Sequence, residues 1–198
     1  MVKSIGFGGC DTTDIVMCVL YQLSAEGIRT LVIDETENGE LVASLPDEGL
    51  DRCYVVSRTS SANELMGEMD ALVVYSGYHP GFWYNRCERK IAAVASSKRD
   101  VRLFVEMVNK VCGHYELLYK GTTDCQYGWF YLDRMLKPYT RMASGKYTLP
   151  RENSDFEAAL IMAYDGQLDI RRMSEPFLGY MAGIVKYLDC RVDAVAPQ

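Results

Sequence analysis

The sequence predicts an α/β fold in which helices cover both faces of a mostly parallel sheet, giving three layers. Three observations lead to this prediction. Short β-rich runs alternate with helix-length apolar segments along the whole chain. One of these runs, Ala71–Tyr75 (ALVVY), is continuously apolar, as strands covered on both faces are. The chain also opens on a strand, a glycine-rich loop, a helix and a second strand, the pattern of a βαβ unit.

The opening unit, residues 3–36, is predicted from its turn and cap signals. A helix-length apolar run is followed by Gly27, which stands where a helix C-cap belongs. A β-rich run then ends at Asp34. The predicted elements are, in order, a strand, a turn, a helix and a strand: Ile5–Phe7, Gly8–Gly9, Asp14–Ala25 and Thr30–Ile33.

Later elements follow from the same kinds of signal. Ser97 with Asp100 and Ser154 with Glu157 have the spacing of capping boxes, and Pro176 suits the start of a last helix. The further predicted strands are Cys53–Ser57, Ala71–Tyr75, Ile91–Ala95, Tyr115–Tyr119 and Tyr147–Leu149. The further predicted helices cover residues 60–69, 97–111, 129–136, 154–165 and 176–188. The apolar stripe expected on the helix over 154–165 is Phe156, Ala159, Leu160 and Ala163.

Residues 76–85 (SGYHPGFWYN) are predicted to be irregular. Two glycines and a proline oppose regular structure there. Four aromatic side chains in so short a loop require either burial or a partner. They are Tyr78, Phe82, Trp83 and Tyr84.

Composition limits the classes of function. A chain of 198 residues, 48% of them hydrophobic, is expected to form a single globular domain over residues 1–198. No apolar run is long enough to cross a bilayer, and the net charge of −6 argues against nucleic-acid binding. The seven cysteines form no CxxC pair and only two histidines are present, so no metal site is predicted. Reduced thiols in the cytoplasm fit this pattern.

The charges are unevenly placed along the chain. Between Asp11 and Asp51 there are ten acids and one base, whereas residues 86–102 hold six bases and two acids. Two separate solvated surfaces are the simpler interpretation. A self-interface between an acidic front and a basic middle is the alternative.

The glycine loop before the first helix is a candidate phosphate site that lacks its usual cation. Such a loop directs backbone N–H groups and the positive helix end toward one point. A P-loop reads GxxxxGK[ST], and its lysine reaches the β- and γ-phosphates. This chain has no lysine between Lys3 and Lys90.

Four stretches in order resemble the MinD/ParA group of deviant P-loop ATPases, whose members position division sites, plasmids, flagella and pili. They are FGGCDTTD with the later VIDET, MDALVVYSG (69–77), KIAAVASSKRDVRLFVEMV (90–108) and FEAALIMAYDGQL (156–168). Together they cover most of the chain. The resemblance implies a P-loop NTPase-like fold of the MinD/ParA type.

The departures from that family affect the residues that carry its chemistry. Phe7 replaces the signature lysine, Asp11 the third glycine, Thr12 the P-loop lysine and Tyr75 the Walker B aspartate, while Thr13 keeps the position that would hold Mg²⁺. We therefore expect a degenerate, empty loop made of Gly8, Gly9, Cys10, Asp11, Thr12 and Thr13. No catalytic residue and no cofactor are predicted. Asp11 to Asp14 are also good N-cap residues, and closing the helix from within is the favoured role for them.

By resemblance, such a protein forms a homodimer and recruits or positions a larger assembly, such as a pilus, secretion, division or partition machine. A non-catalytic pseudo-ATPase of this kind would offer a permanent docking surface. The residues expected to form it are Tyr78, Phe82, Trp83, Tyr84, Arg86 and Arg89.

Other functions remain as alternatives. A working ATP- and Mg²⁺-dependent switch would need cations from elsewhere, such as Arg86, Lys120 or a second subunit. Asp34, at a strand end, could mark a ribose site, but GFGGCD does not give GxGxxG. For a small-molecule enzyme, the sequence offers no set of catalytic residues, because no acid or nucleophile stands at a recognisable catalytic spacing from His79. Cys10 lies near a helix N-terminus, which can activate a thiol, although a packing role is favoured.

Overall fold

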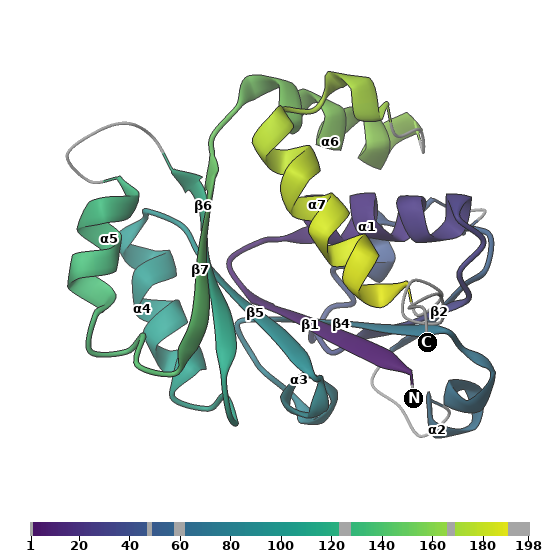
Figure 1. Cartoon of the computed structure of the whole chain (residues 1–198), viewed down its shortest axis with the longest axis horizontal. Helices are drawn as coiled ribbons and strands as arrows, with labels where there is room; N and C mark the ends of the chain where they lie inside the picture. Colours follow the sequence, from purple (N-terminus) through teal and green to yellow (C-terminus); the bar gives the residue numbers. More distant parts are fainter. Residues whose placement is uncertain (1, 47–48, 58–61, 123–127, 166–168, 190–198) are drawn as a thin grey trace, which may run out of the picture.

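One seven-stranded sheet forms the centre of the protein (Figure 1). The computed structural model describes residues 2–46, 49–57, 62–122, 128–165 and 169–189. The strands are β1 (Lys3–Gly9), β2 (Thr30–Asp34), β3 (Cys53–Ser57), β4 (Ala71–Gly77), β5 (Arg89–Val94), β6 (Tyr115–Thr122) and β7 (Ala143–Pro150). Their order is β3-β2-β4-β1-β5-β6-β7, and every neighbouring pair is parallel.

Helices cover both faces of this sheet, as predicted (Figure 1). One face carries α1 (Thr13–Ala25), α6 (Asn153–Asp165) and α7 (Glu175–Leu188). The other face carries α2 (Ala62–Leu65), α3 (Phe82–Arg86), α4 (Lys98–Val108) and α5 (Trp129–Leu136). Three short 3-10 helices are η1 (Val42–Ser44), η2 (Met66–Glu68) and η3 (Ile170–Arg172). None of the described helices is long and apolar enough to cross a membrane.

The core is thickest where β1 and β4 lie between α1 and the opposite helices. Both strands are buried on both faces, which explains the continuous apolar run of β4. The face under α1 and α7 includes Phe7 and Tyr75, whose side chains are essentially inaccessible to solvent. The buried apolar side chains of α7 pack there too. The N-cap of α7 is Ser174, which accepts a hydrogen bond from the Phe177 N–H.

The Ser97 N-cap half of the capping box predicted for α4 is present. The Ser97 hydroxyl accepts a hydrogen bond from the Asp100 N–H at 3.0 Å, and Ser97 also donates to the Asp100 carboxylate. The first of these bonds satisfies one of the backbone N–H groups that a helix start leaves free. The predicted helix over 60–69 appears as α2 followed by η2, and residues 60 and 61 lie outside the described residues.

The prediction that residues 76–85 are irregular was wrong in its second half, because Phe82–Arg86 forms helix α3. The cap comes from a distant residue. The Glu35 carboxylate, just after β2, accepts hydrogen bonds from the N–H groups of Trp83 (2.8 Å) and Tyr84 (3.1 Å). Local sequence cannot reveal a cap supplied from 48 residues away. Gly8 and Gly9 likewise do not form a separate turn, since both continue β1 and pair with β5.

The predicted face of α6 was also wrong. Phe156 and Leu160 are exposed, while Asp155 and Ala158 face inward. The reason is polar: the Asp155 carboxylate accepts hydrogen bonds from the N–H (2.6 Å) and hydroxyl (2.7 Å) of Ser174, just before α7. The helix also begins at Asn153, so that Ser154 lies inside its first turn instead of capping it. The side chain of residue 163 is outside the described set.

Candidate functional site

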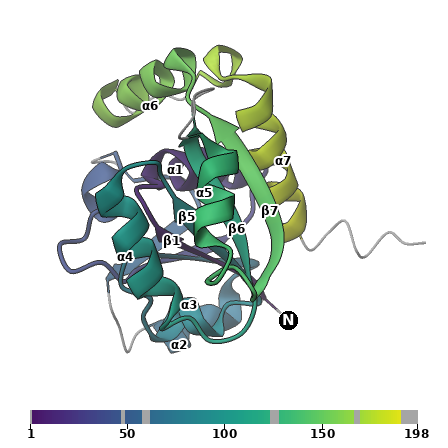
Figure 2. The same cartoon turned by 90° about the vertical axis from the view of Figure 1, so that its left-hand side faces the viewer.

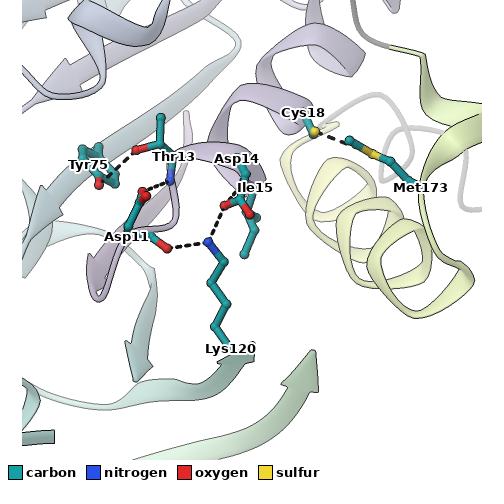
Figure 3. A network of polar contacts seen from close by, with 8 residues as sticks. All are labelled: Asp11, Thr13, Asp14, Ile15, Cys18, Tyr75, Lys120 and Met173. Carbon is teal, nitrogen blue, oxygen red and sulfur yellow. Dashed lines mark hydrogen bonds and ion pairs between the residues drawn. The ribbon is translucent and has the colours of Figure 1, made fainter. Parts of the chain in front are cut away.

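The candidate site lies where the carboxyl ends of β1, β4 and β6 meet the start of α1 (Figure 3). It is the place at which parallel α/β folds bind ligands. Polar side chains from three chain segments meet there. They are Asp11, Thr13 and Asp14 from the β1–α1 connection, Tyr75 from β4 and Lys120 from β6.

Gly9 fixes the direction in which the chain leaves the sheet. Its φ is +102°, and a Cβ placed there would lie 1.9 Å from the carbonyl oxygen of Ala93 in β5. Only glycine fits so close to a neighbouring backbone. The same carbonyl accepts a hydrogen bond from the Cys10 N–H at 3.0 Å. The loop is therefore held against β5 before it turns into α1.

The start of α1 is closed by the chain's own carboxylates. Asp11 Oδ1 accepts a hydrogen bond from the Thr13 N–H at 2.9 Å, and Asp14 Oδ1 accepts one from the Ile15 N–H at 2.8 Å. These N–H groups belong to the set that a helix start leaves free for an anion. The predicted role of the Asp11–Asp14 stretch, closing the helix from within, agrees with this geometry.

Lys120 brings the missing positive charge to the loop from β6 (Figure 3). Its ammonium lies 2.7 Å from Asp14 Oδ1 and also donates to the Asp11 carbonyl oxygen. Both side chains of the ion pair are about four-fifths buried. Burial lowers the pKa of Lys120 while the Asp14 carboxylate raises it, and the net shift is upward. Lys120 therefore stays charged, with its charge committed to Asp14.

The two positions that correspond to a magnesium site by resemblance contact each other instead. The Thr13 hydroxyl donates to the Tyr75 hydroxyl at 3.2 Å. Burial raises the pKa of Tyr75, so its phenol remains neutral and supplies no anionic ligand. The neighbouring Thr12 hydroxyl is fully buried and has no hydrogen-bond partner among the described residues.

Cys10 is a packing residue of the core. Burial raises its pKa to about 12, and the nearby Lys120 offsets only part of that shift. A thiol with this pKa is almost entirely protonated at neutral pH and is a poor nucleophile. Farther along α1, the Cys18 sulfur lies 3.8 Å from the Met173 sulfur, next to the start of α7 (Figure 3).

Two hollows flank the loop, and both are acidic. One, of about 390 Å³, is lined by five carboxylates and two bases. The other, of about 360 Å³, is lined by three carboxylates, one arginine and His79. Asp11 lies between the two and lines both. A polyphosphate entering either hollow would meet an excess of like charge.

Of the residues predicted to form a docking surface, Phe82, Trp83 and Arg86 lie together, whereas the others are buried or paired elsewhere. Phe82 is 61% exposed, and the Arg86 guanidinium lies 4.7 Å from the centre of its ring. Tyr84, in contrast, is fully buried and donates to the Ile91 carbonyl, so it belongs to the core. Arg89 forms two 2.7 Å hydrogen bonds with Glu116.

Of the remaining aromatics in this segment, Tyr78 is half-buried and its hydroxyl donates to Asp100. Trp83 is half-buried against the cluster under α2 and α3. The exposed part of the predicted surface is thus Phe82 and Arg86, with the half-buried Trp83 in edge-to-face contact with Phe82.

Asp34 is a buried anchor whose role the sequence did not reveal. Its carboxylate accepts hydrogen bonds from the N–H and hydroxyl of Thr36 and from the N–H groups of Leu41 and Val42. All these donors lie within eight residues, so the carboxylate folds the loop after β2 onto itself. The alternative in which Asp34 holds a ribose is not supported, because its oxygens are already occupied.

Solved structures share the fold. A chain of the MinC:MinD cell division protein complex of Aquifex aeolicus aligns with 99% of this chain and 98% of its own length, at 10% identity and a TM-score of 0.53. A putative plasmid partition protein from Borrelia burgdorferi B31, bound to AMPPNP, aligns with 98% of this chain and 100% of its own, at 11% identity and a TM-score of 0.56. No protein-family model and no curated protein matches the sequence.

These likenesses confirm the predicted P-loop NTPase-like fold of the MinD/ParA type over nearly the whole chain. At 10–11% identity they concern the fold alone.

Proposed function

We propose that this protein, built on the MinD/ParA-type fold, is a non-catalytic interaction or positioning factor for a larger assembly. In this proposal it binds nucleotide weakly or not at all, and it acts through protein contacts that do not depend on ATP. The assembly would be of the kind that proteins of this fold serve, such as a division or partition machine.

The observation that carries the proposal is the closure of the β1–α1 loop by Lys120. In a P-loop, the helix-start N–H groups and a lysine converge on the phosphates. Here Asp11 and Asp14 occupy two of those N–H groups, and the ammonium of Lys120 is paired with Asp14. Two of the helix-start N–H groups and the lysine are thus satisfied within the chain.

The magnitudes favour loss of nucleotide binding. Two unit charges about 4 Å apart interact by about 4 kcal/mol at an effective dielectric constant of 20. Replacing the P-loop lysine by Thr12 removes one such attraction, and Asp11 adds a repulsion. Tyr75 removes the carboxylate that would organise Mg²⁺. The residues present therefore fit Mg·ATP poorly.

The runner-up function is a working ATP-dependent switch, and the position of Lys120 favours it as the second candidate. Its ammonium lies beside the loop and next to a hollow of about 390 Å³. If Asp14 released it, Lys120 could meet a phosphate. Breaking a buried ion pair costs several kcal/mol, which the nucleotide would have to offset.

Thermal unfolding with and without Mg·ATP separates the two functions. A ligand at 100 times its dissociation constant adds about 2.7 kcal/mol of stability, which corresponds to a shift of about 5–10 °C for a chain of this size. The proposal expects no shift for the wild-type protein at millimolar Mg·ATP. The switch expects a clear shift that disappears in Lys120→Met.

Lys146→Met is the matched control. Lys146 also pairs with an aspartate, Asp133, but it lies on the neighbouring strand β7 and away from the loop. A wild-type shift that survives in Lys146→Met and vanishes in Lys120→Met would refute the proposal in favour of the switch.

A further inference from the structure

The segment from α5 to β7 exposes an unusual amount of apolar surface. Six large side chains there are 39–71% exposed: Trp129, Phe130, Tyr131, Met135, Tyr139 and Met142. The inward face of α5 is already complete, because Leu132 and Leu136 are buried against the cluster under α4. The exposed residues are therefore additional to those that hold α5 in place.

This apolar surface is also basic. Arg134, Lys137 and Arg141 are exposed among the six apolar residues. We call these nine residues the basic end. In Figure 2, which turns this side to the viewer, α5 lies at the front with no described helix or strand over it. The rings of Trp129 and Phe130 meet edge to face, with their centroids 5.8 Å apart.

The opposite end of the molecule has the opposite charge. Along the chain, residues 26–70 contain eleven acids and three bases and residues 98–151 contain ten bases and five acids, among which Asp34, Glu35 and Lys120 are committed to hydrogen bonds inside the molecule. Exposed carboxylates of Glu64 in α2 and Glu68 in η2 lie at that end, together with the 47% exposed ring of Tyr54 in β3. We call these three residues the acidic end.

The strand order keeps the two ends apart. β3 and β7 are the outermost strands of the sheet, with five strands between them. At about 4.8 Å per strand the edges lie roughly 29 Å apart. Figure 1 shows α5 and α2 near opposite limits of the long axis. Since charges are screened beyond about 8 Å at physiological salt, the two ends cannot neutralise each other within one molecule.

We infer that the protein associates with itself head to tail, the basic end of one copy binding the acidic end of the next. Opposite charges attract across this contact, whereas a two-fold contact between two basic ends would bring like charges together. Such heterologous association generates open chains or rings instead of closed dimers.

The exposed apolar area is sufficient for one side of such a contact. Large aromatic side chains bury about 150–250 Å² each when fully covered, so the six side chains of the basic end offer roughly 500 Å². A stable interface of standard size needs about 800 Å² on each partner. Arg134, Lys137 and Arg141 surround the apolar residues and supply much of the remainder.

This inference extends the proposed function by giving it a mode of self-association, and it does not depend on whether nucleotide binds. It also changes the sequence interpretation. Within residues 86–102, Lys90 is buried and Arg89 is paired with Glu116, so these two bases are not available to a partner.

Sedimentation velocity over a concentration series tests the inference. The weight-average mass of the wild type is expected to rise past that of a dimer, and to fall as salt is added. The double variant Phe130→Ser/Arg134→Ala should block the basic end. The double variant Tyr54→Ser/Glu68→Gln should block the acidic end. Each variant loses one apolar anchor and one charge and is expected to associate about a hundredfold more weakly.

The decisive sample is an equimolar mixture of the two blocked variants. Each keeps one intact end, so the mixture should form a one-to-one complex that grows no further. Arg171→Ala/Arg172→Ala, which removes two exposed arginines from η3, is the control and should associate like the wild type. Circular dichroism and thermal unfolding check that every variant is folded.

Three outcomes would overturn the inference. The first is a wild type that stays monomeric at all concentrations. The second is a mixture of blocked variants that remains monomeric, which would indicate a two-fold contact or none. The third is a monomeric wild type that binds phosphatidylserine vesicles and loses this binding in Phe130→Ser/Arg134→Ala, which would make the basic end a membrane contact.

Discussion

At the residue scale, the ion pair between Lys120 and Asp14 determines the character of the candidate site. It joins β6 to the first turn of α1 across 106 residues of sequence. Both side chains are only about one-fifth exposed, so each charge relies on the other for most of its stabilisation. The same pair places a carboxylate, and a lysine already bound to that carboxylate, where a P-loop would hold phosphate.

A double-mutant cycle measures this pair. Lys120→Met leaves Asp14 as a poorly solvated charge, and Asp14→Asn does the same to Lys120. Each single change should lower the free energy of unfolding by about 3–5 kcal/mol. The double variant should lose much less than the sum of the two. Urea unfolding of all four proteins gives the coupling energy.

Lys146 and Asp133 provide the matched control cycle at an exposed site. Their coupling should stay within about 1 kcal/mol, because both side chains are partly solvated. Equal coupling in the two cycles would contradict the special role given to Lys120.

At the element scale, helix α3 depends on Glu35 rather than on its own sequence. Five residues are too few for an isolated helix to be stable. The Glu35 carboxylate caps its N-terminus from the end of β2, and Gly81 leaves room for it, since a Cβ there would lie 2.4 Å from a Glu35 oxygen. Buried Tyr84 then anchors the helix in the core.

We predict that Glu35→Ala destabilises helix α3 locally, so that it unfolds more often than in the wild type. Losing a capping carboxylate costs about 1–2 kcal/mol, and the amides of Trp83 and Tyr84 should exchange with solvent faster than in the wild type. Hydrogen exchange measured by mass spectrometry reports this directly. Glu37→Ala, at an exposed position two residues further on, should leave the exchange of α3 unchanged. If both variants behave alike, Glu35 is not the cap.

At the scale of the whole molecule, buried tyrosines couple folding to alkaline pH. Burial is the main cause that raises the pKa of Tyr75, Tyr84 and Tyr119. In the unfolded chain they ionise near their ordinary value of 10.0. Because the folded pKa is the higher one, their contribution to stability is fully present below pH 10 and is lost as the pH rises further.

The free energy of unfolding is therefore predicted to fall steeply above about pH 10. Tyrosinate absorbance should rise together with the loss of helical circular dichroism. Tyr84→Phe should make the fall less steep, since it removes one of the buried hydroxyl groups whose ionisation is coupled to unfolding. Tyr164→Phe changes a side chain that is 86% exposed and should leave the slope as it is. An unchanged slope in Tyr84→Phe would show that this coupling is misassigned.

Much of the fold could be predicted because its signals are local. The apolar run of β4, the Ser97 cap of α4 and the start of α7 at Pro176 depend on a few residues, and all three were confirmed. The face of α6 was mispredicted because Asp155 finds its partner, Ser174, only after the chain has folded back. A polar contact from outside the helix outweighed its apolar pattern.

The position of the candidate site in the chain could be predicted from the sequence, but the contacts between its side chains could not. The glycines at the end of the first strand located the loop, and the departures at Asp11, Thr12 and Tyr75 led to the prediction that it is degenerate. Lys120 was named only as a possible replacement cation, since nothing in Lys-Gly-Thr-Thr indicates where its side chain lies. Parallel pairing of β5 with β6 brings Lys120 to the same edge of the sheet as the loop.

The sequence by itself therefore determined the α/β class, most of the elements and the absence of a P-loop lysine between Lys3 and Lys90. These properties depend on residue identity and on spacings of a few residues. Only the tertiary structure decided that Asp14 holds Lys120, that Glu35 caps α3, and that bases and acids gather at opposite ends of the sheet. Such contacts join residues far apart in the chain, and the order of strands in the sheet alone brings them together.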